Sequence, residues 1–251
     1  MRTGRRSGSV SLPAPMTLGA IAWWDPSVGI TLNGSKVSAW RDRIGGNVLS
    51  QGTAPLQPAY ANGALVVNLA EWMATAATNP VGVAVGGTYT ALAIIAPAET
   101  TLAYRTPFGA FADAASVRHH VVYYRQGPGE TDALLASTVN ASGEALLYNY
   151  APNAHIDGLV SVTAASGVGG TFELYENSTQ LKSGAASVAA VPSTRFGIGA
   201  TLVNSVASLQ MDGAIHDVVV FDRKLSASEL ATLHAWAAAR KAEISAKLVV
   251  G

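Results

Sequence analysis

One stretch near the C-terminus constrains the fold of this chain more than any other. Residues 211–230 read MDGAIHDVVVFDRKLSASEL, an apolar run followed by a polar segment. Strict alternation along a strand would give one face with Ile215, Asp217, Val219 and Phe221, and a second face with His216, Val218 and Val220. Because both faces carry apolar residues, the sequence predicts a strand that is covered on both sides.

The same stretch predicts the start of a helix. Ser226 and Glu229 have the S-x-x-E spacing of a capping box, in which each side chain bonds the backbone N–H of the other residue. Downstream residues recur at near-helical spacing: Leu230, Leu233, His234, Ala237 and Ile244. The chain is therefore predicted to carry one C-terminal helix, over about 226–246, packed beside the strands.

Three segments resemble the concanavalin A-like / laminin G-like sandwich domains. The segment DGAIHDVVVFDRKLSASEL is similar to the family's closing strand and helix start. WWDPS at 23–27, VSAWRD at 37–42 and QPAY at 57–60 resemble the opening of bacterial and phage members, and RFGIGA at 195–200 resembles the penultimate strand. The resemblance implies an all-β fold: a two-sheet antiparallel jelly-roll sandwich with a C-terminal α-helix, over residues 18–251.

Short strands separated by turns are predicted along the chain. They cover 21–24, 36–41, 65–69, 89–96, 119–125, 145–150, 159–164, 171–175 and 179–182. Asn33-Gly34 predicts one hairpin turn, and Glu176-Asn177-Ser178 predicts another. Trp23, Trp40 and Trp236 match framework positions or the helix face, so we expect them in the core.

The composition limits the partners. Charged residues make up 13% of the chain and the net charge is zero, against a usual charged share of about 25%. So little charge favours a surface partly buried against partners, and we expect a homo-oligomer. No basic excess points to nucleic acid, and the apolar runs are too short for membrane insertion. Cysteine is absent, which excludes disulfides, thiol catalysis and cysteine-ligated zinc.

Residues 1–17 are predicted to form a flexible basic N-terminal arm. Arg2, Arg5 and Arg6 lie among glycines and serines that cannot bury a core face. Two interpretations stay open, a disordered tail and a strap that docks on other virion proteins. A signal peptide is disfavoured because Pro13 and Pro15 interrupt the segment that would have to be hydrophobic.

No catalytic or metal-binding constellation stands out. A glycosidase of this fold would carry E-x-D-x-x-E on one strand, and the nearest string, ETDALL at 130–135, ends in leucine. His119 and His120 are adjacent on a predicted strand and would point to opposite faces. The remaining acids are scattered: Asp25, Asp42, Asp113, Asp157 and Glu173. We expect no enzyme activity and no cofactor; the family resemblance leaves calcium as an alternative, with Asp157 or Asp212 contributing.

Aromatic residues give the clearest indication of ligand binding. Sugars stack on flat rings, and polar side chains hydrogen-bond their hydroxyls. One strand end and the loop after it combine both kinds of group, and we predict a carbohydrate site there formed by Tyr148, Asn149, Tyr150, Asn153 and His155. Tyr148 and Tyr150 would share one face because they are two residues apart.

Three functions follow from the resemblance. The first is a virion surface protein, a fibre or decoration component of a phage tail or head, whose module binds cell-surface polysaccharide in host attachment. The second is a purely structural decoration protein without a ligand. The third, a polysaccharide hydrolase or lyase, is disfavoured by the missing carboxylates. The expected location is the virion surface, or else the outside or surface of a bacterium.

Overall fold

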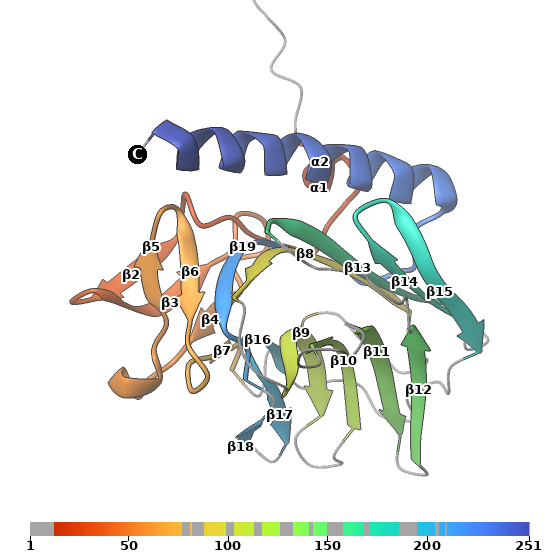
Figure 1. The fold of residues 1–251 in the computed structure, drawn as a ribbon, viewed down its shortest axis with the longest axis horizontal. Coiled ribbons are helices and arrows are strands. Elements are labelled where there is room, and N and C mark those ends of the chain that lie inside the picture. Colours follow the sequence, from red (N-terminus) through yellow and green to blue (C-terminus); the bar gives the residue numbers. More distant parts are fainter. Residues whose placement is uncertain are drawn as a thin grey trace, which may run out of the picture.

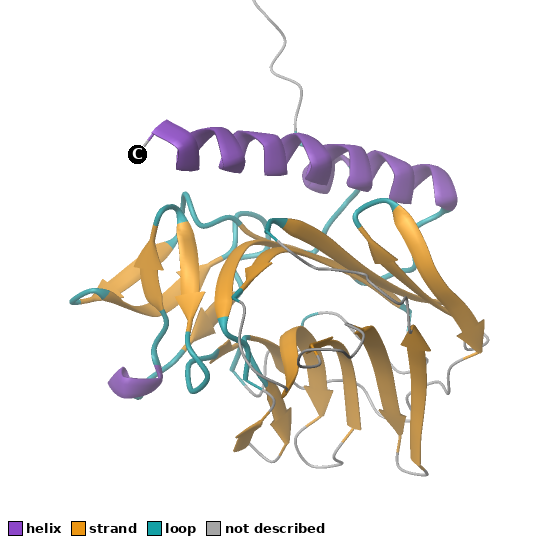
Figure 2. Cartoon of the chain, in the orientation of Figure 1, coloured by secondary structure: helices purple, strands orange, loops and turns teal. Residues whose placement is uncertain are grey.

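The chain forms two layers of antiparallel strands, with a long helix across the outer face of one layer (Figure 1). This computed structural model describes residues 13–76, 81, 88–98, 103–112, 117–125, 133–140, 143–149, 158–167, 171–185, 195–203, 206–208 and 210–250. Strands dominate the chain, as Figure 2 shows. The prediction of an all-β sandwich with a C-terminal helix is confirmed.

The layer beneath the helix has six strands that pair in the order β1-β19-β8-β13-β14-β15. Their bounds are Ala22–Trp24 (β1), Gly213–Phe221 (β19), Tyr89–Pro97 (β8), Val160–Gly167 (β13), Thr171–Glu176 (β14) and Thr179–Ala185 (β15). The closing strand predicted from the sequence, β19, thus pairs with the first strand of the domain on one side and with β8 on the other.

The opposite layer pairs in the order β7-β16-β9-β10-β11-β12. Its strands are Met73–Ala74 (β7), Arg195–Ile198 (β16), Ala103–Ala112 (β9), Val117–Arg125 (β10), Ala133–Asn140 (β11) and Gly143–Asn149 (β12). Further short elements flank the two layers: β2 (Ile30–Asn33), β3 (Lys36–Arg41), β4 (Val48–Ser50), η1 (Ala54–Leu56), β5 (Ala59–Ala61), β6 (Ala64–Val67), β17 (Thr201–Val203) and β18 (Val206–Ser208). Neither β9 nor β11 was predicted from the sequence.

The main core lies between the two layers, and a second apolar cluster lies beneath α2; β19 contributes residues to each of them. Val218 and Val220 belong to the inner core, whereas Val219 and Phe221 face the helix. The prediction that Ile215 shares a face with Asp217 is wrong. A register shift opposite β8 places an extra residue between them, so Ile215 joins the inner core. A β-bulge of this kind reverses the alternation of side chains along the strand.

The C-terminal helix α2 spans Ala227–Val250 and begins where the sequence predicts. The Ser226 N–H donates to Glu229 Oε2 over 2.8 Å, and the Glu229 N–H donates to Ser226 Oγ over 3.4 Å. One face of the helix packs on the outer face of β8 and β19, through Leu230, Leu233, Ala237 and Ile244. Among the described helices, none combines the length and apolar character needed to cross a membrane.

Both predicted hairpin turns are confirmed. Asn33 ends β2 and Lys36 begins β3, with Gly34 at φ +64°. Asn177 connects β14 to β15 in the left-handed region, at φ 55°, which asparagine tolerates better than most residues.

The segment predicted as an arm is folded in its described part. The short helix α1 covers Ala14–Thr17, with Pro15 buried and Met16 packed against the cluster beneath α2. Residues 1–12, with Arg2, Arg5 and Arg6, lie outside the described residues, so their role stays a prediction.

Candidate functional site

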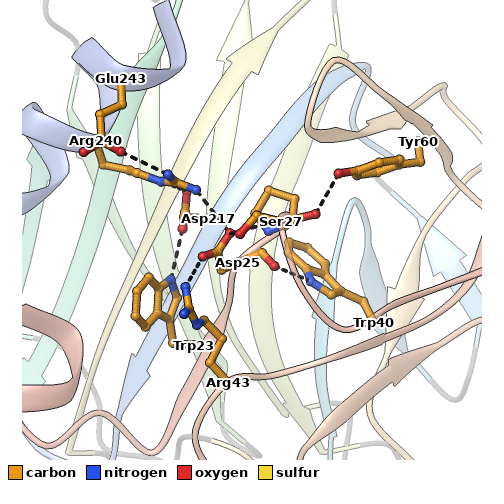
Figure 3. Close-up of polar contacts among 10 residues, drawn as sticks. Trp23, Asp25, Ser27, Trp40, Arg43, Tyr60, Asp217, Arg240 and Glu243 are labelled. Atoms are coloured by element: carbon orange, nitrogen blue, oxygen red, sulfur yellow. Dashed lines mark hydrogen bonds and ion pairs between the residues drawn. The ribbon is translucent and has the colours of Figure 1, made fainter. Parts of the chain in front are cut away.

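The three segments WWDPS, VSAWRD and QPAY, which we call the front motif, meet in a hydrogen-bonded junction (Figure 3). The Trp24 indole N–H donates to the Trp40 carbonyl over 3.1 Å, and the Trp40 indole N–H donates to the Asp25 carbonyl over 3.2 Å. The Tyr60 hydroxyl donates to the Pro26 carbonyl over 2.8 Å. WWDPS, VSAW and QPAY therefore meet because each satisfies buried polar groups of another, which is a structural role.

Both oxygens of the Asp25 carboxylate accept hydrogen bonds. Its Oδ1 accepts from the Ser27 N–H (2.8 Å), from the Ser27 hydroxyl (2.7 Å) and from Arg240 Nη2 (3.1 Å). Its Oδ2 accepts from Arg43 Nη1. Burial alone would raise the pKa of Asp25, but the hydrogen bonds from Ser27 and the positive charge of Arg240 hold it below its ordinary value.

Arg240 of α2 joins Asp25 to a second buried acid, Asp217 of β19. Arg240 Nε donates to Asp217 Oδ2 over 3.0 Å, and the Trp23 indole N–H donates to Asp217 Oδ1 over 3.0 Å. Burial raises the pKa of Asp217 to about 6, with the nearby Asp25 adding to the rise, although Arg240 and Trp23 oppose it. Arg240 reaches outward to Glu243 as well, over 3.1 Å.

We call these six side chains the Arg240 network: Trp23, Asp25, Arg43, Asp217, Arg240 and Glu243. All of them except Asp217 line a cleft of about 270 Å³ beside α2. Trp236 closes one wall, edge-on to Trp23 with ring centroids 5.6 Å apart, and the Arg43 guanidinium lies 4.7 Å from the Trp23 ring centre. Each oxygen of Asp25 and Asp217 accepts a hydrogen bond, and through Arg240 both acids anchor the helix.

A larger pocket, about 710 Å³, opens at the start of α2. It lies between the β14–β15 hairpin and the loop from β19 into the helix. Lys224 Nζ bonds Glu173 Oε1 over 2.6 Å, and the Tyr175 hydroxyl donates to Glu173 Oε2 over 2.8 Å. Gln180 is exposed and lies directly opposite Tyr175 in the β14–β15 ladder. We call it the Tyr175 pocket.

Arg223 and Glu229 complete the wall of the Tyr175 pocket near the helix start. Arg223 donates two hydrogen bonds to the Glu229 carboxylate, over 2.9 and 2.8 Å, and a third to the Leu18 carbonyl over 2.9 Å. The Arg223 contacts and the Ser226 cap lower the pKa of Glu229 to about 2. The helix start is thereby tied to the chain just before β1.

The predicted carbohydrate site falls partly on described residues. Tyr148 and Asn149 are the last residues of β12, opposite Leu135 and Leu134 of β11. Tyr150, Asn153 and His155 lie outside the described residues, so the site stays a prediction.

The tryptophans expected in the core lie in it or against it. Trp23 and Trp40 are buried, and Trp236 packs partly buried against the cluster beneath α2.

His119 and His120 are consecutive residues of β10. The string at 130–135 is described only from Ala133, and Asp157 is outside the described residues. In the part of the chain that is described, which includes Asp212, no three histidine or acidic side chains gather as a metal site.

Neither pocket is predicted from the sequence, where Asp25 and Glu173 are scattered acids and nothing marks Arg240 or Lys224. One signal was available: an acid inside an apolar strand, as at Asp217, requires a buried partner. The identity of that partner depends on how α2 crosses the sheet, which no local pattern contains.

Comparison with known proteins gives a fold class. No family model and no curated protein sequence matches the chain. Among solved structures, the receptor-binding domain of botulinum neurotoxin type G aligns with a TM-score of 0.57 at 12% identity, over 86% of this chain and 51% of that one.

Two further structures align over the same share of the chain. Domain 4 of AbnA, an extracellular arabinanase from Geobacillus stearothermophilus solved with arabinotriose, has a TM-score of 0.56 at 18% identity, over 86% of this chain and 98% of that one. A Trypanosoma rangeli sialidase has a TM-score of 0.52 at 18% identity, over 86% of this chain and 33% of its own. At such identities the likeness establishes the fold, an antiparallel β-sandwich. It spans about half of the neurotoxin chain and a third of the sialidase chain.

Proposed function

We propose that this chain is a concanavalin A-like / laminin G-like module that binds carbohydrate at a virion surface and takes part in attachment without catalysis. The observation that carries the proposal is the match to domain 4 of the arabinanase. That domain was solved with arabinotriose, and 98% of it aligns with 86% of this chain. The neurotoxin domain is named for receptor binding and the sialidase was solved with sialic acid, which agrees with a module that binds a ligand at a surface.

The binding residues proposed first are Tyr148, Asn149, Tyr150, Asn153 and His155. Among the described ladders, β12 pairs with β11 alone, which makes it the edge strand of its layer. An edge strand has a neighbouring strand of its own layer on one side only. Two aromatic rings followed by amide and imidazole groups provide the stacking surface and polar contacts that sugars require.

A binding role without catalysis agrees with the state of the described acids. Asp25 and Asp217 are both engaged with Arg240, and Glu173 is paired with Lys224. A retaining or inverting glycosidase needs two carboxyl groups that face the scissile bond. Acids already bonded to cations of the fold are unsuited to that task.

The virion location rests on composition and on the front motif. A charged share of 13% suits a protein packed against neighbours, and WWDPS resembles the opening of phage members of the family. A decoration protein without a ligand would share both features, so binding has to be measured.

Deleting residues 1–12 should leave the melting temperature unchanged and lower the occupancy of the protein on particles. Normal occupancy would remove the docking role of the arm.

A glycan array probed with the full-length chain tests the binding function. We expect binding to at least one neutral glycan, with no release of reducing sugar from the matching polysaccharide. Tyr148→Ala should weaken binding several-fold, whereas Tyr148→Phe, which keeps the ring, should retain it. Melting temperatures of both variants equal to that of the unmodified chain would exclude unfolding as the cause. Absence of any bound glycan, or release of sugar, would overturn the proposal.

A further inference from the structure

The two pockets beside α2 differ in how far their polar groups are exposed. In the Arg240 network, the side chain of Asp217 is 0% exposed and that of Asp25 is 3% exposed. In the Tyr175 pocket, the side chains of Glu173 and Lys224 remain 21% and 25% exposed despite their ion pair. Their remaining donors and acceptors can therefore meet a ligand.

The charges that line the Tyr175 pocket balance. Glu173 is paired with Lys224, and Glu229 is paired with Arg223. A free anion would face both acids, and a free cation would face both bases, so neither gains from the pocket. A neutral ligand rich in hydroxyl groups can instead donate to the acids and accept from the cations.

Tyr175 gives this pocket a ring held in place. Its hydroxyl is bonded to Glu173, and its ring lies 5.1 Å from the His234 ring at an angle of 56°. Burial and the Glu173 carboxylate raise the pKa of Tyr175, which keeps the phenol a donor. Gln180, on the same face of the ladder, adds an amide that both donates and accepts. An ordered ring beside an amide and an ion pair is a suitable surface for a sugar.

We infer that the Tyr175 pocket is a second carbohydrate subsite, which takes a neutral oligosaccharide through Tyr175, Gln180, Glu173 and Lys224. This inference rests on the proposed glycan-binding function. It places the subsite on the outer face of the layer beneath α2, on elements other than β12 and the loop that follows it.

The test uses the full-length chain with Tyr148→Ala as background, so that the loop after β12 contributes little. The probe is the neutral glycan that gives the strongest array signal with the unmodified chain, with arabinotriose titrated in parallel. Ala227 is exposed and lines the pocket, so Ala227→Trp should fill it and weaken the residual binding at least tenfold. Gln180→Ala, which removes only the amide, should weaken it by about fivefold.

Two matched controls accompany these variants. Ala238→Trp places the same ring at an exposed position further along α2, and Thr179→Ala truncates the exposed neighbour of Gln180. Both should bind as the background does, and thermal melts should show all variants folded.

Three results would count against the subsite. Residual binding that survives both Ala227→Trp and Gln180→Ala overturns it, and so does complete loss of binding in Tyr148→Ala alone. Either result leaves the proposed function intact. Failure of the unmodified chain to bind any glycan overturns the proposed function and the subsite together.

Discussion

The middle and the start of α2 use charge in different ways. Near its middle, Arg240 connects two almost fully buried acids and links the helix to β19 and to the front motif. At its start, Arg223, Glu229 and Ser226 form an exposed cap beside the roomy Tyr175 pocket. Buried charges must be completely paired and leave nothing for a ligand, whereas partly exposed pairs can hold the fold and still offer hydrogen bonds.

The largest expected effect is on stability, from Arg240→Ala. Removal of this cation leaves Asp217 and Asp25 buried with fewer partners, so the free energy of unfolding should fall by about 3 kcal/mol or more. Urea denaturation measures it. The control Lys247→Ala removes an exposed cation from the same helix and should cost no more than about 0.5 kcal/mol. Equal losses in the two variants would mean that the network does not hold the helix.

The pH dependence of stability should reveal the burial of Asp217. Its pKa rises from 3.8 to about 6 on folding, so the native state binds a proton first as the pH falls. Stability through this group is therefore lost as the pH rises from about 4 to 6. Relative to Asp217→Asn, the unmodified chain should gain about 2–3 kcal/mol between pH 7 and pH 4.

The comparison with Asp217→Asn also removes the effect of His216, whose titration changes stability in the opposite direction. Burial lowers the pKa of His216 to about 4, so protonation of this histidine destabilises the native state as the pH falls from 6.5 towards 4. His216 is present in both proteins, so the difference between their unfolding free energies isolates Asp217. A difference that stays flat between pH 4 and 7 would show that Asp217 titrates near its ordinary pKa.

The cap at the helix start should matter less. Ser226→Ala removes the acceptor of the Glu229 N–H and should cost about 1 kcal/mol. Thermal and urea unfolding give the value. Because the Arg223–Glu229 pair is partly exposed, its own contribution should weaken further in high salt. An unchanged melting temperature in Ser226→Ala would mean that the hydroxyl is dispensable for the helix start.

The smallest effects on stability are expected at the exposed residues of the two pockets. Glu243→Ala should change the free energy of unfolding by less than about 0.5 kcal/mol, because the Glu243 side chain is 62% exposed. Gln180→Ala should be equally mild, since Gln180 is exposed on β15. A large loss of unfolding free energy in either variant would contradict the distinction between groups that stabilise the fold and groups that are free to bind a ligand.

Local patterns were enough to predict much of the fold. The cap at Ser226 and Glu229, the hairpin turns and the double-sided β19 each depend on residues that are close in sequence. The bulge between Ile215 and Asp217 was missed because it exists only against β8. Alternation along one strand carries no information about the register of its partner.

The candidate sites were less predictable for the same reason. Arg240 bonds Asp25 across 215 positions of sequence, and Lys224 bonds Glu173 across 51 positions. Residue type suggests that a buried acid needs a cation, but topology selects which one. The predicted loop after β12 could be proposed because its aromatic and amide residues are consecutive.

Carbohydrate binding without catalysis is tested most directly by a calorimetric titration of the chain with its strongest array glycan, followed by analysis of the sugar recovered. We expect saturable binding with the glycan intact, weakened by Tyr148→Ala and unaffected by Glu243→Ala. A chain that binds no glycan, or that returns the sugar cleaved, would contradict this expectation.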